Sequence, residues 1–124
     1  MQQLFLVMVG GAVGAGARFA LGQAVSARLT AFFPYATLTV NLLGCLAMGL
    51  LAGWLARSGA NETLRLLLGV GLLGGFTTFS AFSLDWWQLM ERGATGAAMA
   101  YAAISLVGAL AAFGCGTALY RLLA

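Results

Sequence analysis

The chain lacks histidine and lysine altogether, and charged residues make up only 7% of its 124 positions. A soluble domain carries about a quarter charged residues, so this composition excludes one. Without histidine, and with two cysteines that each lie in an apolar stretch, nearly every metal-site and nucleophile-plus-base scheme is excluded. The six arginines stand singly and form no basic patch. We therefore predict neither an enzyme nor a nucleic-acid-binding protein.

Long apolar stretches fill most of the chain, which is 62% hydrophobic and has a mean hydropathy of +0.98. Runs of about 18 apolar residues or more mark membrane-spanning helices. Charge-free runs cover 1–17, 29–56, 66–84 and 93–120. We predict an all-α membrane protein, with residues 1–124 forming a single integral membrane domain of four transmembrane helices. The predicted spans are 3–27, 34–56, 63–88 and 96–121.

The arginines leave the orientation of the chain in the membrane undecided. Four spans place both termini and the loop after the second span on one side, together with Arg57, Arg65 and Arg121. The other side carries Arg28 and Arg92. Because orientation follows the side richer in basic residues, a nearly even split sets no preference. We hypothesise that the chain inserts both ways and pairs with an inverted copy as an antiparallel, dual-topology homodimer.

Glycines spaced four apart occur in three of the four spans. The pairs are Gly10 and Gly14, Gly49 and Gly53, and Gly71 and Gly75. Such pairs let helix backbones approach closely in lipid. A glycine-rich chain also produces them by chance, so they predict tight packing rather than a function.

The middle of the third span is a poor helix interior. Residues 74–82 (GGFTTFSAF) combine two glycines, two β-branched threonines, a serine and three phenylalanines. A break there would free backbone carbonyls, which is tolerated at membrane depth only where they are buried in protein or line a site. Two such breaks facing each other in an inverted dimer would offer carbonyl oxygens to a small cation such as Na⁺. A continuous helix with hydroxyls bonded to the preceding turn is the alternative.

Other polar side chains lie within the predicted spans. Asn41 either joins helices by hydrogen bonds, which is its more ordinary role, or contacts a permeating species. Tyr101 and Ser105 stand four apart on one helical face. Arg18 is costly at membrane depth and indicates either an aqueous vestibule or a side chain that reaches to the surface. This inventory of hydrogen-bond donors without acids suits an anion.

Three motifs, in their order along the chain, resemble the Fluc (CrcB) fluoride channel family. They are residues 10–19 (GGAVGAGARF), 41–44 (NLLG) and 74–82. The resemblance extends over the whole chain in length, four-span layout and motif order, and the third motif is the most specific. It implies a passive channel that exports fluoride from microorganisms. It also implies a protein of the bacterial inner membrane, built as an antiparallel homodimer with two pores.

The resemblance implies roles for individual residues. Asn41 corresponds to the family's pore-lining amide, and Phe79 and Phe82 to phenylalanines whose ring edges line the pores. The backbone carbonyls of Gly74 and Thr77 correspond to those that hold a structural Na⁺ at the dimer centre.

Further roles along the fluoride pathway follow from the same resemblance. Ser80 belongs to the third motif, and Tyr101 and Ser105 match part of a polar track on the fourth helix. Ala109 stands where many relatives have another hydroxyl, which puts the length of that track in doubt. Arg18 matches an arginine of the first helix, and we expect it to act in vestibule electrostatics or in structure.

Two alternatives stay open at this point. A small dual-topology, proton-coupled drug exporter needs a carboxylate within the membrane, whereas Glu62, Asp85 and Glu91 all lie at span ends. A non-catalytic membrane scaffold would need only the glycine-rich packing faces. Asn61 matches a glycosylation acceptor in Asn-Glu-Thr, and we expect it to cap a helix instead.

Overall fold

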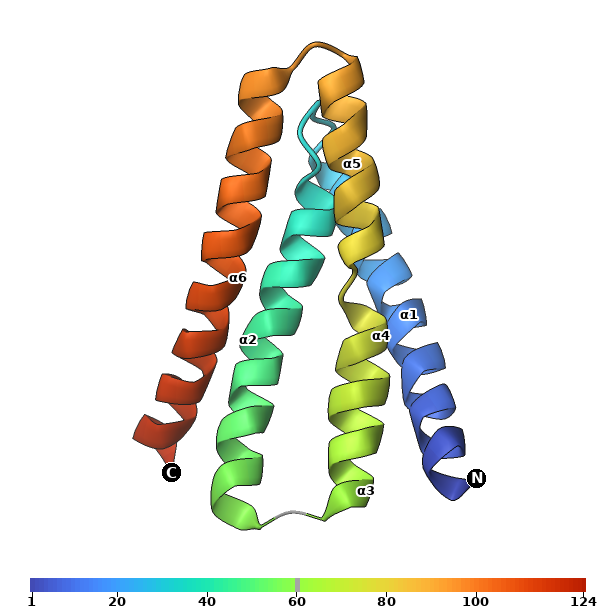
Figure 1. The fold of residues 1–124 in the computed structure, drawn as a ribbon, viewed down its shortest axis with the longest axis vertical. Coiled ribbons are helices and arrows are strands. Elements are labelled where there is room, and N and C mark those ends of the chain that lie inside the picture. Colours follow the sequence, from blue (N-terminus) through green and yellow to red (C-terminus); the bar gives the residue numbers. More distant parts are fainter. Residues whose placement is uncertain (60) are drawn as a thin grey trace.

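The computed structural model describes residues 1–59 and 61–124, and helices are the only regular secondary structure in them (Figure 1). Its elements are α1 (Gln2–Arg28), α2 (Tyr35–Ser58), α3 (Glu62–Leu64), η1 (Arg65–Leu73), α4 (Gly74–Phe76), α5 (Phe79–Glu91) and α6 (Thr95–Leu123). The four elements from α3 to α5 follow one another as a single interrupted rod. Four helical stretches are therefore long and apolar enough to cross a membrane, which confirms the predicted fold class.

The four rods pack mainly as two pairs. α1 lies along η1 and α4, whereas α2 lies along α6. Both termini and α3 lie at one end of the molecule, and the connection from α5 to α6 lies at the other (Figure 1). Arg57, Arg65 and Arg121 therefore share one end, as the four-span layout predicts.

Glycine makes both helix pairs possible because the backbones nearly touch. A Cβ added at Gly14 of α1 would collide with the Leu72 carbonyl oxygen of η1. In the other pair, a Cβ at Gly49 of α2 would collide with the Phe113 carbonyl oxygen of α6. The predicted close-packing role of these glycines is confirmed.

The third rod is broken two residues beyond its glycine pair. Thr77 and Thr78 are extended, with ψ of 158° and φ of −151° respectively, and α5 begins at Phe79. The sequence predicts a break within residues 74–82, and the break lies there, although Gly74 and Gly75 themselves are still helical. A Cβ on Gly75 would lie 2.6 Å from the carbonyl oxygen of Gly11, so this glycine serves helix packing. The break itself falls on the β-branched threonines, which fit extended backbone well.

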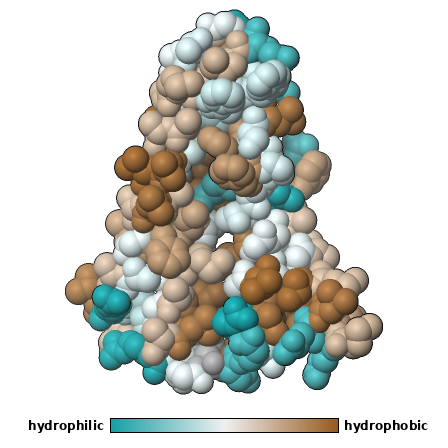
Figure 2. Space-filling view, in the orientation of Figure 1, coloured by the Kyte–Doolittle hydropathy of each residue, from teal (hydrophilic) through white to brown (hydrophobic). Residues whose placement is uncertain are grey.

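The buried core is small and lies toward the connection between α5 and α6. Leu38, Leu89, Ala98 and Tyr101 form it. Much of the remaining surface is apolar: Figure 2 shows brown and pale residues over most of the visible face, with teal residues mainly along its lower edge and at its upper right. An apolar exterior of this kind suits a bilayer or a second protein surface.

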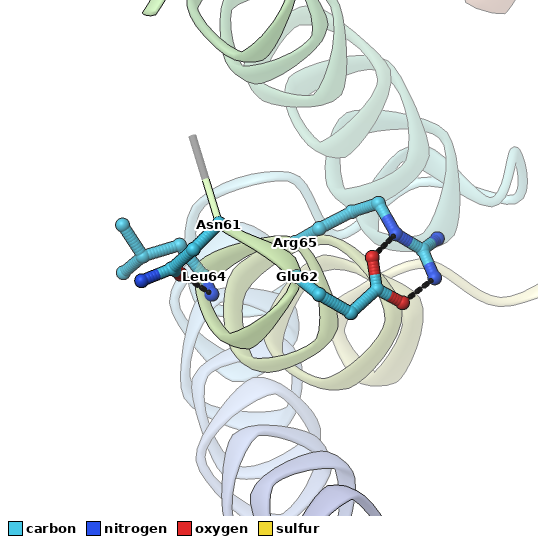
Figure 3. Close-up of polar contacts among 4 residues, drawn as sticks. All are labelled: Asn61, Glu62, Leu64 and Arg65. Atoms are coloured by element: carbon cyan, nitrogen blue, oxygen red, sulfur yellow. Dashed lines mark hydrogen bonds and ion pairs between the residues drawn. The ribbon is translucent and has the colours of Figure 1, made fainter. Parts of the chain in front are cut away.

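The third rod begins with a helix cap, as predicted. The backbone N–H of Leu64 donates to Asn61 Oδ1 at 3.0 Å. In the next turn, two guanidinium nitrogens of Arg65 bond the two oxygens of Glu62 at 2.8 and 2.6 Å (Figure 3). Both partners are exposed, so water screens the pair and it adds little to stability.

Candidate functional site at the break in the third span

The break is held to α2 by one side chain. Asn41 Nδ2 donates to the carbonyl oxygen of Thr78 at 2.9 Å, and the Thr78 N–H donates to Asn41 Oδ1 at 2.7 Å. Thr78 is buried and Asn41 is half-buried. Asn41 therefore joins helices, the role that its residue type favours, because it satisfies backbone groups that the break has freed.

The threonine hydroxyls bond to the helices on either side of the break. Thr78 Oγ1 accepts from the Ala81 N–H at 3.1 Å and caps α5, and it lies 3.3 Å from Ser80 Oγ. Thr77 Oγ1 donates back to the Leu73 carbonyl at 3.1 Å. Each half of the interrupted rod is thus closed by a threonine hydroxyl.

Two carbonyls lose their helical donors as a consequence. In a continuous helix the carbonyl of residue i accepts from the N–H of residue i+4. The N–H of Thr78 would serve Gly74, and the N–H of Ala81 would serve Thr77. Both N–H groups are bonded elsewhere, to Asn41 and to the Thr78 hydroxyl. These two carbonyls are the ones predicted to hold Na⁺.

A cavity of about 490 Å³ lies beside the break and brings much of the predicted pathway together. Its lining comprises Asn41, Cys45, Thr77, Thr78, Phe79, Phe82, Ala102, Ser105, Leu106 and Ala109. The rings of Phe79 and Phe82 lie with their centroids 5.3 Å apart. Apart from the amide and hydroxyl groups the walls are apolar, and no acidic side chain lines them.

Tyr101 stands apart from Ser105, although the two share a helix face. Its hydroxyl donates to Asp85 Oδ2 at 3.2 Å, and the residue is fully buried. Its ring packs against Phe82 at 5.0 Å and edge-on against Phe33 at 5.5 Å, both between centroids. Tyr101 therefore lies behind the cavity wall and supports the ring of Phe82.

Three residues of this region were not among the predicted site residues. Thr78, Cys45 and Asp85 take part in the break, the cavity wall and the support behind it. Only Asp85 carries a readable signal, since it follows Phe82 by three residues and so shares its helix face.

Arg18 lines a second, smaller cavity of about 270 Å³ between α1, α2 and α5. Its neighbours there include Thr37, Val40 and Thr78. Thr78 thus borders both cavities. Over residues 1–59 and 61–124 the ion pair of Glu62 with Arg65 is the only one. The positive charge of Arg18 is therefore not neutralised by an ion pair and makes this cavity more positive.

The chemistry of the region is that of neutral oxygens and donors. In the described residues no group of three or more His, Cys, Asp or Glu side chains could hold a metal ion. The carbonyls of Gly74 and Thr77 are hard, uncharged oxygens, and their donor set fits an alkali cation. The amide, the hydroxyl and the positive ring edges beside them fit an anion.

Comparison with known proteins agrees with this layout. The family model described as "CrcB-like protein, Camphor Resistance (CrcB)" matches residues 5–117. A protein of Sphingopyxis alaskensis is 60% identical over 122 residues, which cover 98% of this chain and 97% of that one. Another, of Novosphingobium aromaticivorans, is 50% identical over 117 residues, 93% of each chain. Both are named fluoride-specific ion channel FluC. The chain is a multi-pass membrane protein and belongs to the CrcB-like family.

Proposed function

We propose that the chain forms a fluoride-selective passive channel in the bacterial inner membrane and exports fluoride from the cytoplasm. An inside-negative potential drives an anion outward by about 2.3 kcal/mol per charge for each 100 mV. The relatives that carry the fluoride channel name match nearly the full length of this chain. Their name is that of a channel and not of an enzyme.

The observation that carries the proposal is the cavity beside the break. Fluoride is small and strongly hydrated, so a selective pore must replace its water with closely spaced donors. The cavity offers the amide of Asn41, the hydroxyl of Ser105 and the rings of Phe79 and Phe82. Without a carboxylate in its lining, the cavity does not repel an anion.

We propose further that two chains assemble as an antiparallel homodimer with two pores. Phe79 is 79% exposed although it lines the cavity, so a single chain leaves the cavity open. An inverted second copy would cover that opening. The arginines are divided three to two between the ends of the rods, which permits insertion in both orientations.

A structural Na⁺ at the centre of the dimer belongs to the same proposal. The carbonyls of Gly74 and Thr77 from two inverted chains would together supply four oxygens to the cation. The cation would brace two breaks that face each other near mid-membrane. Its charge would also attract the anion toward the neighbouring pores.

The two alternatives gain no support from the site. A proton-coupled drug exporter needs an acid along its pathway, whereas Asp85 is bonded to Tyr101 behind the cavity wall. A scaffold would account for the glycine contacts but not for the donors gathered around the cavity.

The test is anion efflux from liposomes that contain the purified protein. The liposomes are loaded with fluoride or chloride, valinomycin clamps the potential through K⁺, and ion-selective electrodes follow release. We expect rapid fluoride release with chloride retained. Absence of release of either ion from well-folded dimers would refute the channel and favour the scaffold.

A further inference from the structure

The amide oxygen and the amide nitrogen of Asn41 both bond the same residue, Thr78. Asn41 accepts the N–H of Thr78 at 2.7 Å and donates to the carbonyl of Thr78 at 2.9 Å, across 37 positions of sequence. This reciprocal pair reproduces the way one strand bonds its neighbour. An extended backbone within the membrane is thereby satisfied by a side chain of another helix.

These two hydrogen bonds also determine whether the carbonyl of Gly74 accepts a helical hydrogen bond, although Asn41 does not bond that carbonyl. If the N–H of Thr78 were released, the nearest helical acceptor along the chain would be the carbonyl of Gly74. The break could then shorten toward a continuous helix, and that carbonyl would be occupied. By holding Thr78, Asn41 keeps the Gly74 oxygen free of its helical donor.

We infer that Asn41 is a positioning residue for the cation site, through its two hydrogen bonds to Thr78. This inference rests on the proposed Na⁺ site and deepens it. Asn41 contributes no oxygen to the cation. It fixes the extended backbone from which the neighbouring carbonyls reach the ion.

The same amide links the cation site to the anion pathway. An asparagine amide has two N–H donors, and one of them serves the Thr78 carbonyl. The other remains for the cavity that Asn41 lines. A change at Asn41 therefore alters Na⁺ binding as well as fluoride conduction, whereas a change at Ser105 in the same cavity alters conduction alone.

The experiment measures Na⁺-dependent stability rather than transport. Thermal unfolding of the purified protein in detergent is followed while N-methylglucamine replaces Na⁺ in steps. The variants are Asn41→Leu, which keeps the volume but loses both bonds, and Asn41→Ser, which is too short to make both. Val40→Ala is the matched control, since Val40 is buried beside Asn41 and makes no bond to the break.

We expect the Na⁺ concentration at half-stabilisation to rise roughly tenfold in the Asn41 variants, the change that follows from losing about one hydrogen bond's net contribution. Val40→Ala should lower Tm at every Na⁺ concentration without moving that midpoint. The inference is overturned if Asn41→Leu has the same Na⁺ midpoint as the wild type. If the leucine variant does not fold, the same result in Asn41→Ser overturns it. A wild type that melts independently of Na⁺ overturns it together with the cation site. Fluoride efflux by the same preparation then decides the channel separately.

Discussion

At the scale of single residues, two polar side chains within the spans have partners that the tertiary structure supplies. Asn41 bonds the break, and Tyr101 bonds Asp85. The spacing of Tyr101 and Ser105 predicts one polar stripe on α6. However, α5 packs against α6 at Tyr101, and the Tyr101 hydroxyl bonds Asp85 of α5. Ser105, one turn farther along, lines the cavity.

The ring edges of the cavity can be tested by Phe79→Ile and Phe82→Ile. Isoleucine keeps apolar bulk but removes the positive ring edge, so we expect fluoride efflux to fall about tenfold, which corresponds to losing an interaction of about 1.4 kcal/mol. Electrode recordings from liposomes measure the rate. Phe5→Ile is the control, because Phe5 is an exposed residue of α1 outside the cavity. Wild-type rates in both cavity variants would contradict a ring-edge role.

Replacing Tyr101 with phenylalanine tests the support behind Phe82. The variant keeps the ring packing but leaves Asp85 without its hydroxyl donor, at a cost of about 1–3 kcal/mol. We expect a lower Tm in detergent and little change of halide preference. Tyr35→Phe, at an exposed position, should leave Tm unchanged. Equal stability of the Tyr101 variant and the wild type would show that the bond to Asp85 contributes nothing.

At the scale of elements, glycine positions decide which helices touch. Gly14 faces the backbone of η1, whereas Gly16, two residues along the same helix, has no atom within 4 Å of an added Cβ. Sequence spacing identifies Gly14 as a packing position. It also places the break within residues 74–82, but it does not show that Gly75 stays helical in close contact with α1 and that the break falls on Thr77 and Thr78.

The substitutions Gly14→Ala and Gly16→Ala test whether Gly14, unlike Gly16, packs against a neighbouring helix. A methyl group at 14 collides with the Leu72 carbonyl, so the helices must separate, and we expect a loss of about 1–3 kcal/mol. At 16 the methyl group meets open space and alanine is the better helix former, which favours stability by up to about 1 kcal/mol. Thermal unfolding in detergent should therefore shift in opposite directions. Equal shifts would contradict the close packing of α1 on η1.

At the scale of the whole molecule, the charges at the two ends govern insertion. The end with both termini carries three arginines and the other carries two, a difference too small to fix orientation. Exposed positions are present at both ends of the molecule. Lysines added at one end should therefore bias the orientation of insertion without disturbing the cavity.

Orientation can be locked by paired lysine substitutions at exposed positions. Gln2→Lys with Ser58→Lys biases one orientation, and Thr30→Lys with Thr95→Lys biases the other. We expect each double variant alone to lose most fluoride export, and co-expression of the two to restore it. Fluoride tolerance of the host cells reports the outcome. Full activity of one locked variant by itself would refute the antiparallel assembly.

The sequence alone determined the class of the protein. Uninterrupted apolar length specifies four helical spans, because in lipid an isolated segment of that length satisfies its own backbone only as a helix. The motifs also pointed to Asn41, Phe79, Phe82 and Ser105, which the fold gathers around one cavity.

Only the tertiary structure decided how the break is closed. The position of the break, the bonding of Asn41 to Thr78 and the partnership of Tyr101 with Asp85 all depend on which helices lie side by side. These contacts join residues that are distant along the chain, and no local spacing encodes them. The physical reason is that a backbone group freed within a membrane takes whichever partner the packing brings within hydrogen-bond distance.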